Sequence, residues 1–495
     1  MTKRIISLIT LVLLCFTFAT AYAEHTEDSS YIYDYWGSAN ESLNAFELST
    51  VIDSESVDGV TIKSVDDVYV HDGRVFIADS QSNAIVVLDE QGKLLDQIKI
   101  IRHPDGRIVV DESNNKQAIL NGPKGVYAND NNLYIADTGN NRIFVLDINA
   151  VDEEGHNTYP LNMVINKPEN MVGSTEFVPS KLAVDNAERI FVVAENSSEG
   201  IIELNTDGSF SRYFGVNSPT VSLIDFFWRS IASEEQKKQM SKIYAPAFSN
   251  VQTDSDGFVY AVTTDTASTE MAFRFNAKGE NVLRKFGYSE TLGDLPTSMT
   301  DASKSTFTDI AVSDYGVYAL LDTSKNRVFL YNFDGNLLTV FGGKGDTKGK
   351  LNTPSSICWM GDSLIVGDSR LACAFVFTPT DFGKLVLEAE EKYFNGDFDG
   401  AAVLNEKIVS MNANYDHAYV SIGKNRLMQD NYEEAMHYFR LGNDKTYYSK
   451  AFAGYRNLLI QKYFIIFAIV FLAFVVWVLW TEIAYNRKQK KLEEL

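Results

Sequence analysis

Four aspartates stand at one recurring position of a repeated sequence pattern, where they could either bind a metal or fix loops. They are Asp79, Asp137, Asp322 and Asp368, each at the end of a short apolar run. A ring of carboxylates would suit a hard divalent cation, whereas a single carboxylate can accept backbone N–H bonds and fix its own loop. Because one metal site rarely needs the same acid from every repeat, the sequence favours the structural role.

Two arginines accompany these aspartates, and few other residues with catalytic potential come together. Arg142 and Arg327 follow their aspartates by five residues and are expected to brace the same loops. His71 falls in a repeat turn, whereas His103 and His156 fall in insertions, which does not suit a multi-histidine metal site. The sequence contains no nucleophile elbow, no H-E-x-x-H motif and no glycine-rich phosphate loop.

The elements that position these residues come from a 23-residue unit. Each unit predicts a strand, a tight turn, a second strand, the loop with its aspartate, and a third strand. The copies are residues 67–89, 125–147, 181–205, 250–276, 309–332 and 356–378, and a fourth strand is expected at 94–100, 209–215, 281–287 and 337–343. Six units of four antiparallel strands predict a mainly β protein, with a six-bladed β-propeller over residues 45–380.

The last copy lacks a fourth strand because the chain passes at once into helical sequence. Residues 45–52 (AFELSTVI), before the first copy, have strand character. We expect them to supply the outer strand of the last blade, which closes the ring and removes its free edge.

The repeats closely resemble the NHL repeat, whose signature includes an ADTGNNR-like loop. Residues 137–142 (DTGNNR) match it almost letter for letter, and residues 322–327 (DTSKNR) are a second clear match. Asp79 keeps the acid but is followed by Ala84 at the arginine position, and Asp368 is followed by Cys373. The resemblance implies an NHL-type propeller over residues 45–380; it does not imply one function, because propellers include enzymes, receptors and scaffolds.

Long insertions occur mostly between the fourth strand of one blade and the first strand of the next, so they would lie on one face. The insertion at 216–246 has apolar residues at roughly helical spacing and is expected to form a helix over the propeller channel. The alternative is a binding surface made by Phe226, Phe227, Trp228 and Arg229, since aromatic residues and arginine anchor such surfaces. These four residues are the candidate ligand- or partner-binding site; no catalytic and no metal-binding residue is predicted.

Both ends of the chain carry membrane-related signals. Residues 1–23 are expected to be a signal peptide cut after Ala23, followed by an aromatic segment at 24–44 that packs across a blade edge. Residues 463–484 predict one transmembrane helix, and the basic residues of the tail at 485–495 are typical of a cytoplasmic flank. Because Lys450, Arg456 and Lys462 weaken the charge asymmetry, the expected cytoplasmic position of the tail depends mainly on the signal peptide. The bulk of the chain is then outside the cytoplasm.

The segment before the membrane helix, residues 381–462, predicts a small helical stalk. Phe398 and Tyr432, like Ala401 and Ala435, are 34 residues apart, the period of tetratricopeptide repeats, which the segment resembles. Such repeats usually bind proteins. Cys358 and Cys373 are expected to be packed thiols, because their strands are too far apart for a disulfide.

Composition and layout together favour a binding protein. The net charge of −22 argues against a nucleic-acid partner. The layout resembles bacterial surface proteins that combine NHL and tetratricopeptide repeats with one anchor, which implies a membrane partner such as a transporter subunit of a carbohydrate-uptake system, or a carbohydrate ligand. The expected function is therefore a membrane-anchored extracytoplasmic binding or scaffold protein without a cofactor. The alternative is a metal-dependent propeller hydrolase, similar to lactonases and esterases.

Overall fold

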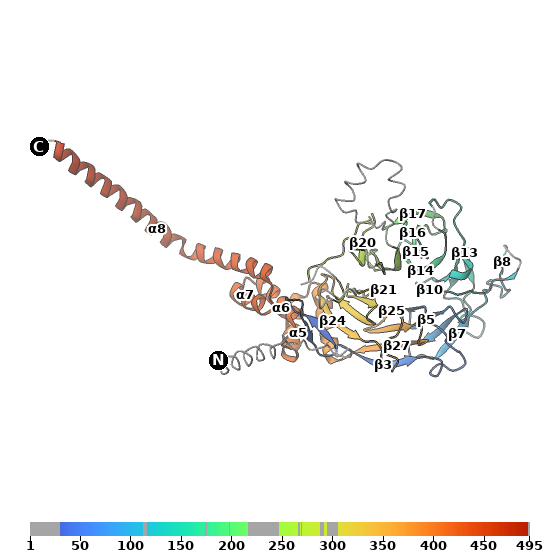
Figure 1. The fold of residues 1–495 in the computed structure, drawn as a ribbon. Coiled ribbons are helices and arrows are strands. Elements are labelled where there is room, and N and C mark those ends of the chain that lie inside the picture. Colours follow the sequence, from blue (N-terminus) through green and yellow to red (C-terminus); the bar gives the residue numbers. More distant parts are fainter. Residues whose placement is uncertain are drawn as a thin grey trace, which may run out of the picture. The chain divides into compact units, whose positions relative to one another are not determined.

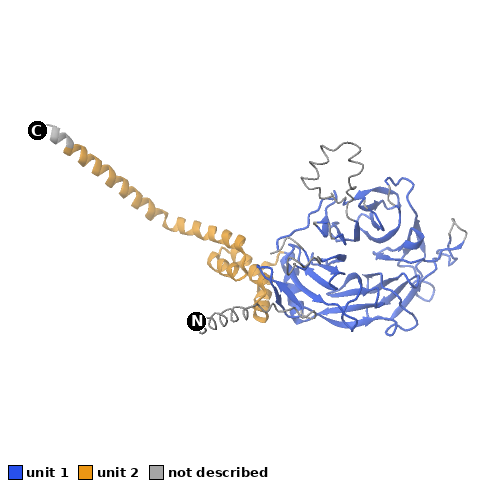
Figure 2. Cartoon of the chain, in the orientation of Figure 1, with its two compact units in different colours: residues 1–395 blue, residues 396–495 orange. Residues whose placement is uncertain are grey.

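The computed structural model describes residues 30–111, 116–173, 176–197, 199–215, 247–265, 268, 270–287, 292–294 and 305–493. The chain divides into two units, Met1–Asn395 and Gly396–Leu495 (Figure 2). The predicted signal peptide and Phe226–Arg229 lie outside the described residues. Each unit is treated by itself below.

The first unit is a six-bladed β-propeller (Figure 1). Blade 1 contains β4 (Asp67–His71), β5 (Arg74–Asp79), β6 (Ala84–Asp89) and β7 (Leu94–Ile98). Blade 2 contains β10 (Gly125–Ala128), β11 (Asn132–Asp137), β12 (Arg142–Asp147) and β13 (Leu161–Ile165), with a 3-10 turn η1 (Thr138–Asn140). Blade 3 contains β14 (Pro179–Val184), β15 (Ile190–Ala194), β16 (Ile201–Leu204) and β17 (Phe210–Phe214).

The remaining blades follow in chain order. Blade 4 contains β18 (Phe248–Thr253), β19 (Val259–Thr263) and β20 (Ala272–Phe275). Blade 5 contains β21 (Phe307–Val312), β22 (Tyr318–Asp322), β23 (Arg327–Tyr331) and β24 (Leu337–Gly342). Blade 6 contains β25 (Pro354–Met360), β26 (Ser363–Asp368), β27 (Cys373–Pro379) and β3 (Phe46–Ile52). The first strands touch in a closed cycle, β4, β10, β14, β18, β21, β25 and β4 again, so the six predicted blades are confirmed.

The ring closes as predicted, because β3 pairs antiparallel with β27 and completes blade 6. Val51 lies opposite Phe375, and the pairing extends to Phe46 opposite Pro379. Helix α4 (Asp381–Phe394) begins directly after this contact, and its cap Thr380 donates its backbone N–H to the Ala45 carbonyl at 3.0 Å. The first and last parts of the propeller are thereby joined.

Blade 4 contradicts the predicted fourth strand at residues 281–287. This segment makes only an isolated bridge to β20, between Phe275 and Asn281. Arg284 contacts Asp334 in the turn of blade 5 at 2.8 Å, and the Phe286 N–H donates to the Asp334 carbonyl at 2.8 Å, whereas Lys285 contacts Glu270 of blade 4 at 2.9 Å. The two contacts with Asp334 draw the segment toward the blade 5 turn instead of along β20.

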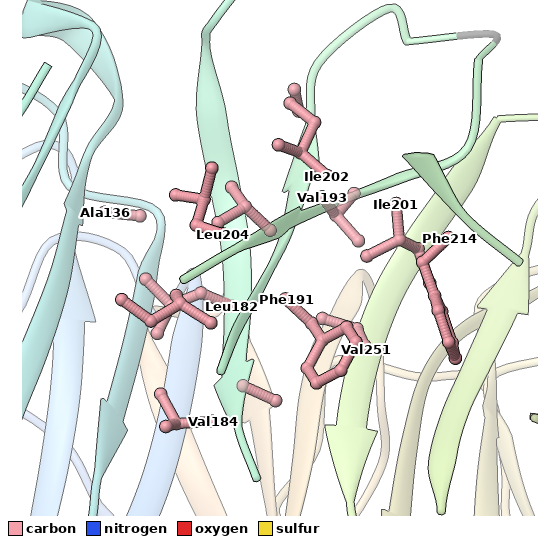
Figure 3. Close-up of a cluster of buried hydrophobic side chains, with 14 of the residues drawn as sticks. Ala136, Leu182, Val184, Phe191, Val193, Ile201, Ile202, Leu204, Phe214 and Val251 are labelled. Atoms are coloured by element: carbon pink, nitrogen blue, oxygen red, sulfur yellow. The ribbon is translucent and has the colours of Figure 1, made fainter. Parts of the chain in front are cut away.

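The apolar residues of the blades pack between neighbouring sheets. In the interface around blade 3, Phe191, Ile201 and Phe214 belong to one buried cluster with residues of blades 2 and 4 such as Ala136 and Val251 (Figure 3). Strands in this position are covered on both faces, which explains their continuous apolar runs. Cys358 and Cys373 are both buried and free, as predicted.

Two further pieces decorate the propeller. A hairpin of β8 (Val110–Asp111) and β9 (Lys116–Gln117) extends from the connection between blades 1 and 2. Strands β1 (Tyr31–Tyr33) and β2 (Ala39–Glu41) add to the outer edge of blade 5, next to β24. The predicted packing of the aromatic segment across a blade edge is confirmed for Tyr31, which is 2 % exposed, whereas Trp36 is 77 % exposed.

The second unit is helical. It contains α5 (Phe398–Met411), α6 (Asp416–Met428), α7 (Tyr432–Leu441) and α8 (Lys445–Glu493). Within α8, the helix Lys445–Lys488 is long enough to cross a membrane and contains an 18-residue window with a mean hydropathy of 2.8. The start of α8 packs on α7, where the Phe439 and Tyr447 rings stack at 5.5 Å. The predicted last stalk helix and membrane helix are therefore one continuous helix.

Candidate functional site

The first strand of each blade has no neighbour strand on its channel side, so side chains must bond its backbone N–H groups. Asp67 Oδ2 accepts from the Val126 N–H of the next blade at 2.9 Å. Asp309 Oδ2 likewise accepts from the Ile357 N–H of blade 6 at 2.7 Å. These two acids occupy the same position in their repeats, and buried carboxylates thus link neighbouring blades at the centre of the propeller.

The first residues of the six repeat copies, which include these two acids, form a ring that we call the neck ring. Its six members, one from each first strand, are Asp67, Gly125, Lys181, Asn250, Asp309 and Ser356. Only glycine fits at the Gly125 position, because a Cβ there would lie 2.4 Å from the Ser180 carbonyl oxygen. The ring brings together residues that are far apart in the sequence, because each comes from a different blade.

One ammonium of this ring pairs with one of its two carboxylates. Lys181 Nζ contacts Asp67 Oδ1 at 2.6 Å and donates to the Asp66 carbonyl at 2.8 Å. Across the ring, the Asn250 amide donates to Asp309. These ring residues are all buried, so their charges are poorly screened by water.

The electrostatic consequence falls mainly on Asp309. Burial raises the pKa of Asp309 to about 7; the Lys181 ammonium opposes the rise, and the Asp67 carboxylate adds to it. Burial also raises the pKa of Asp67, against the effect of Lys181. The carboxyl group of Asp309 therefore gains or loses its proton near neutral pH.

Beside the ring, larger side chains narrow the channel further. The Tyr69 and Tyr127 rings lie 4.6 Å apart, and the Tyr127 hydroxyl donates to the Val184 carbonyl at 2.8 Å. Together with Cys358 and the ring members Asp67, Asn250 and Asp309, they line a cavity of about 20 Å³, which is room for about one water molecule. Burial raises the pKa of Cys358 to about 12, so this thiol is not a nucleophile at neutral pH.

The donor set of the ring does not fit a divalent cation. The Lys181 ammonium stands against Asp67, where a cation would have to bind, and the carboxylate oxygens already accept N–H bonds. Over the described ranges, no three or more His, Cys, Asp and Glu side chains are grouped so that they could hold a metal. The chemistry that suits the ring is proton binding and blade-to-blade linkage.

The four repeated aspartates are fully buried and fix loops, as predicted. Asp79 Oδ2 accepts from the Lys63 N–H at 2.8 Å, and Asp368 Oδ2 accepts from the Asn352 N–H at 2.6 Å. The bracing role of Arg142 is confirmed, since its Nε donates to Asp137 Oδ2 at 2.8 Å.

The bracing role predicted for Arg327 is wrong. Its guanidinium turns away from Asp322 and contacts Asp294 Oδ2 at 2.9 Å, because Asp294 and the aromatic strand β1 offer it both a carboxylate and a ring. The three histidines of the propeller have different neighbours: His71 lies 3.3 Å from Asp130, the His103 N–H donates to the Arg107 carbonyl, and His156 lies beside Asp152.

Sequence reasoning did not single out the neck ring. A signal was available, because the first residue of each copy is polar or glycine although the strand that follows is apolar. The candidate residues Phe226, Phe227, Trp228 and Arg229 lie outside the described residues and are not placed relative to the ring.

Comparison with known proteins gives one family match. The NHL-repeat family matches residues 120–146, which include β10, β11 and most of β12. No curated protein matches the chain.

Several solved structures are similar in fold. A virginiamycin B lyase from Staphylococcus aureus is 12% identical, with a TM-score of 0.40 over 67% of this chain and 99% of that chain. A gluconolactonase from Xanthomonas campestris is 14% identical, with a TM-score of 0.36 over 62% of this chain and 82% of that chain. The extracellular domain of a one-component system from Bacteroides thetaiotaomicron is 13% identical, with a TM-score of 0.34 over 63% of this chain and 33% of that chain.

Proposed function

We propose that this chain is a membrane-anchored, extracytoplasmic binding protein. Its propeller would present one face to a ligand or a protein, and its C-terminal helices would dock a partner in the same membrane. The neck ring is the observation that carries this proposal. Its polar side chains are engaged by their own ion pair and by blade-to-blade hydrogen bonds, and the cavity of about 20 Å³ that Asp67, Asn250 and Asp309 help to line is too small for a sugar or a lactone. Among the described residues, the centre of the propeller therefore favours binding of a larger ligand at a face.

Helix α8 supports the anchor. The 44-residue candidate helix, Lys445–Lys488, would measure about 66 Å at 1.5 Å per residue, whereas a bilayer core needs about 30 Å. The first part of the helix is used differently, since Ala451 is fully buried and Gly454 packs on Tyr432. We infer that residues 463–484 cross the membrane and that the bundle of α5, α6 and α7 lies close to its outer surface.

The orientation follows from the residues at the two ends of the chain. Arg487 and Lys488 follow the apolar segment, as is typical of a cytoplasmic flank. The hydrophobic N-terminal segment with Ala21-Tyr22-Ala23 has the pattern of an export signal. Both favour a propeller outside the cytoplasm and a short cytoplasmic tail at 485–495.

The proposed binding face is the end where blades are connected to one another. In the sequence, the long connections at 101–122, 216–246 and 288–305 all join a blade to the next, so we expect them to share one end of the propeller; the structure describes only 101–111, 116–122, 292–294 and 305 of these residues. Long loops on a rigid scaffold usually carry function. Phe226, Phe227, Trp228 and Arg229 remain the proposed anchors, with Trp228 as the central one.

The helical bundle supports a protein partner. Helices α5 and α7 begin 34 residues apart, at Phe398 and Tyr432. A Cβ at Gly423 would lie 2.7 Å from the Phe439 ring, so α6 and α7 pack closely, as the helices of a tetratricopeptide repeat do. We propose that this bundle binds a membrane protein, with a transporter subunit of a carbohydrate-uptake system as the first candidate.

Affinity purification of the full-length protein from gently solubilised membranes tests the proposal. Wild type is expected to recover defined envelope or transporter proteins, and Trp228→Ala/Arg229→Ala is expected to lose those bound by the propeller. Lys278→Ala, an exposed change in a blade turn, is the matched control and should lose nothing. Hydrolysis of lactones or esters that depends on a bound divalent metal would contradict the proposal and favour the hydrolase alternative.

A further inference from the structure

Arg327 departs from the arrangement of its counterpart in blade 2. There, Asp137 and Arg142 are opposite each other on β11 and β12, and they form a buried ion pair at 2.8 Å. In blade 5, Asp322 and Arg327 are opposite each other on β22 and β23 in the same way. The two blades therefore have the same backbone pairing at these positions, but only blade 2 forms the ion pair between the aspartate and the arginine.

Without this ion pair, only one of the two carboxylate oxygens of Asp322 accepts hydrogen bonds from the described residues. Its Oδ1 accepts from the Ser324 N–H at 2.8 Å and from the Thr306 N–H at 3.1 Å. Its Oδ2 is buried and has no hydrogen-bond partner in the part of the chain that the structure describes. The equivalent oxygens of Asp79, Asp137 and Asp368 all accept hydrogen bonds. A buried carboxylate oxygen without a partner is unfavourable, so blade 5 retains a vacant acceptor for a guanidinium.

Arg327 instead holds the N-terminal strap, by which we mean residues 30–41. Its Nη1 donates to Asp294 Oδ2 at 2.9 Å and to the Tyr31 hydroxyl at 3.0 Å, and its guanidinium carbon lies 5.2 Å from the Tyr31 ring centroid. Tyr31 and Tyr33 both donate their hydroxyls to Asp294. Tyr31 lies opposite Val340 on β24, so this cluster fastens the strap to the outer edge of blade 5.

We propose that Arg327 has two positions and that the strap is a displaceable cover of blade 5. When the strap is docked, Arg327 binds Asp294 and Tyr31; when the strap leaves, Arg327 turns onto Asp322, as Arg142 binds Asp137. Because Asp322 and Arg327 already lie opposite each other, a side-chain rotation is sufficient. Release of the strap then exposes the edge of β24. Its free-energy cost is lower than the loss of the strap contacts alone would cause, because Arg327 gains the ion pair with Asp322.

Hydrogen exchange of the strap amides in the full-length, detergent-solubilised protein tests this proposal. Asp322→Asn keeps an acceptor oxygen for the loop N–H groups but removes the charge that would receive Arg327. It should therefore slow strap exchange, on the order of fivefold, whereas Asp294→Asn should accelerate it about tenfold. The matched control Asp137→Asn should lower the thermal midpoint and leave strap exchange unchanged. Unchanged or faster strap exchange in Asp322→Asn overturns the proposal.

Thermal midpoints give an independent second test. Asp294→Asn alone should lower the midpoint modestly, because Arg327 can still turn onto Asp322. The double variant Asp294→Asn/Asp322→Asn removes both partners of Arg327 and should lower the midpoint by more than the sum of the two single changes. An additive double variant overturns the two-position proposal whether or not the strap binds anything else.

Discussion

At the residue scale, the neck ring combines two buried carboxylates with one buried ammonium. The ion pair of Lys181 with Asp67 leaves Asp309 on the far side of the ring, with an amide and backbone N–H groups as its partners. Such a ring is stable only while each charge has a partner, since an unpaired buried charge is strongly destabilising. Single substitutions in the ring should therefore have effects that depend on pH.

Asp309 should make the stability of the propeller fall as pH rises. Folded Asp309 keeps its proton up to its raised pKa of about 7, whereas an unfolded carboxyl loses it near pH 4. Between these values the folded state binds more protons, so its stability decreases, by at most about 1.4 kcal/mol per pH unit from this group. Asp309→Asn should flatten this part of the slope. Thermal midpoints of both proteins at pH 5, 6, 7 and 8 provide the check, and equal slopes would refute it.

Lys181→Met should destabilise the propeller by about 3–5 kcal/mol, because it leaves Asp67 without its ammonium. The loss should be larger at pH 8 than at pH 5, since protonation relieves the unpaired carboxylates. Adding Asp67→Asn should recover much of the loss at pH 8. Chemical denaturation at the two pH values measures both effects, and a loss that is the same at both would contradict the electrostatic explanation.

At the element scale, two features of the sequence predicted the strands. One is the alternation of apolar and polar residues, and the other is the expectation of four strands in each blade. The closing strand β3 could be predicted because the last repeat lacked a fourth strand and residues 45–52 alternate. The strand expected at 281–287 was wrong, since Arg284 finds its charged partner, Asp334, in blade 5. Propensity alone does not reveal such partners.

The contact between α4 and the closing strand gives an element-scale prediction. Gly383 in the first turn of α4 lies so close to Ala45 that an added Cβ would be 1.9 Å from the Ala45 carbonyl oxygen. Gly383→Ala should therefore push β3 away from β27 and destabilise the ring by about 2–4 kcal/mol. The exposed neighbour Lys384→Ala should be nearly neutral. Faster hydrogen exchange in β3 is the expected signature, and unchanged β3 protection would exclude this role of Gly383.

At the scale of the whole molecule, the number of blades, the helices and the apolar span were all predictable, whereas the neck ring was not. The ring depends on which residues converge from different blades, such as Lys181 and Asp67, which are 114 residues apart. No local pattern records that convergence. The loop aspartates were predictable in role because each one bonds its own loop and the adjoining connection.

The anchor gives a prediction for the whole chain. A chain ending at Arg456 keeps the residues of α8 that pack on α7, including Ala451, and loses the apolar segment. It should be recovered in the soluble extracytoplasmic fraction, whereas the full chain should stay with the membranes and resist extraction at high pH. A truncated chain that remains in the membrane fraction would refute α8 as the anchor.

The most direct test of the proposed function is site-specific photocrosslinking in intact cells. A photoreactive residue replaces Trp228 on the proposed binding face, or, as the control, Asp72 in an exposed turn at the opposite end of blade 1. The proposed function predicts a defined cross-linked envelope protein from position 228 and none from position 72. Equal cross-linking from both positions, or none from position 228 while the protein is folded and in the membrane, would contradict a binding role for this face.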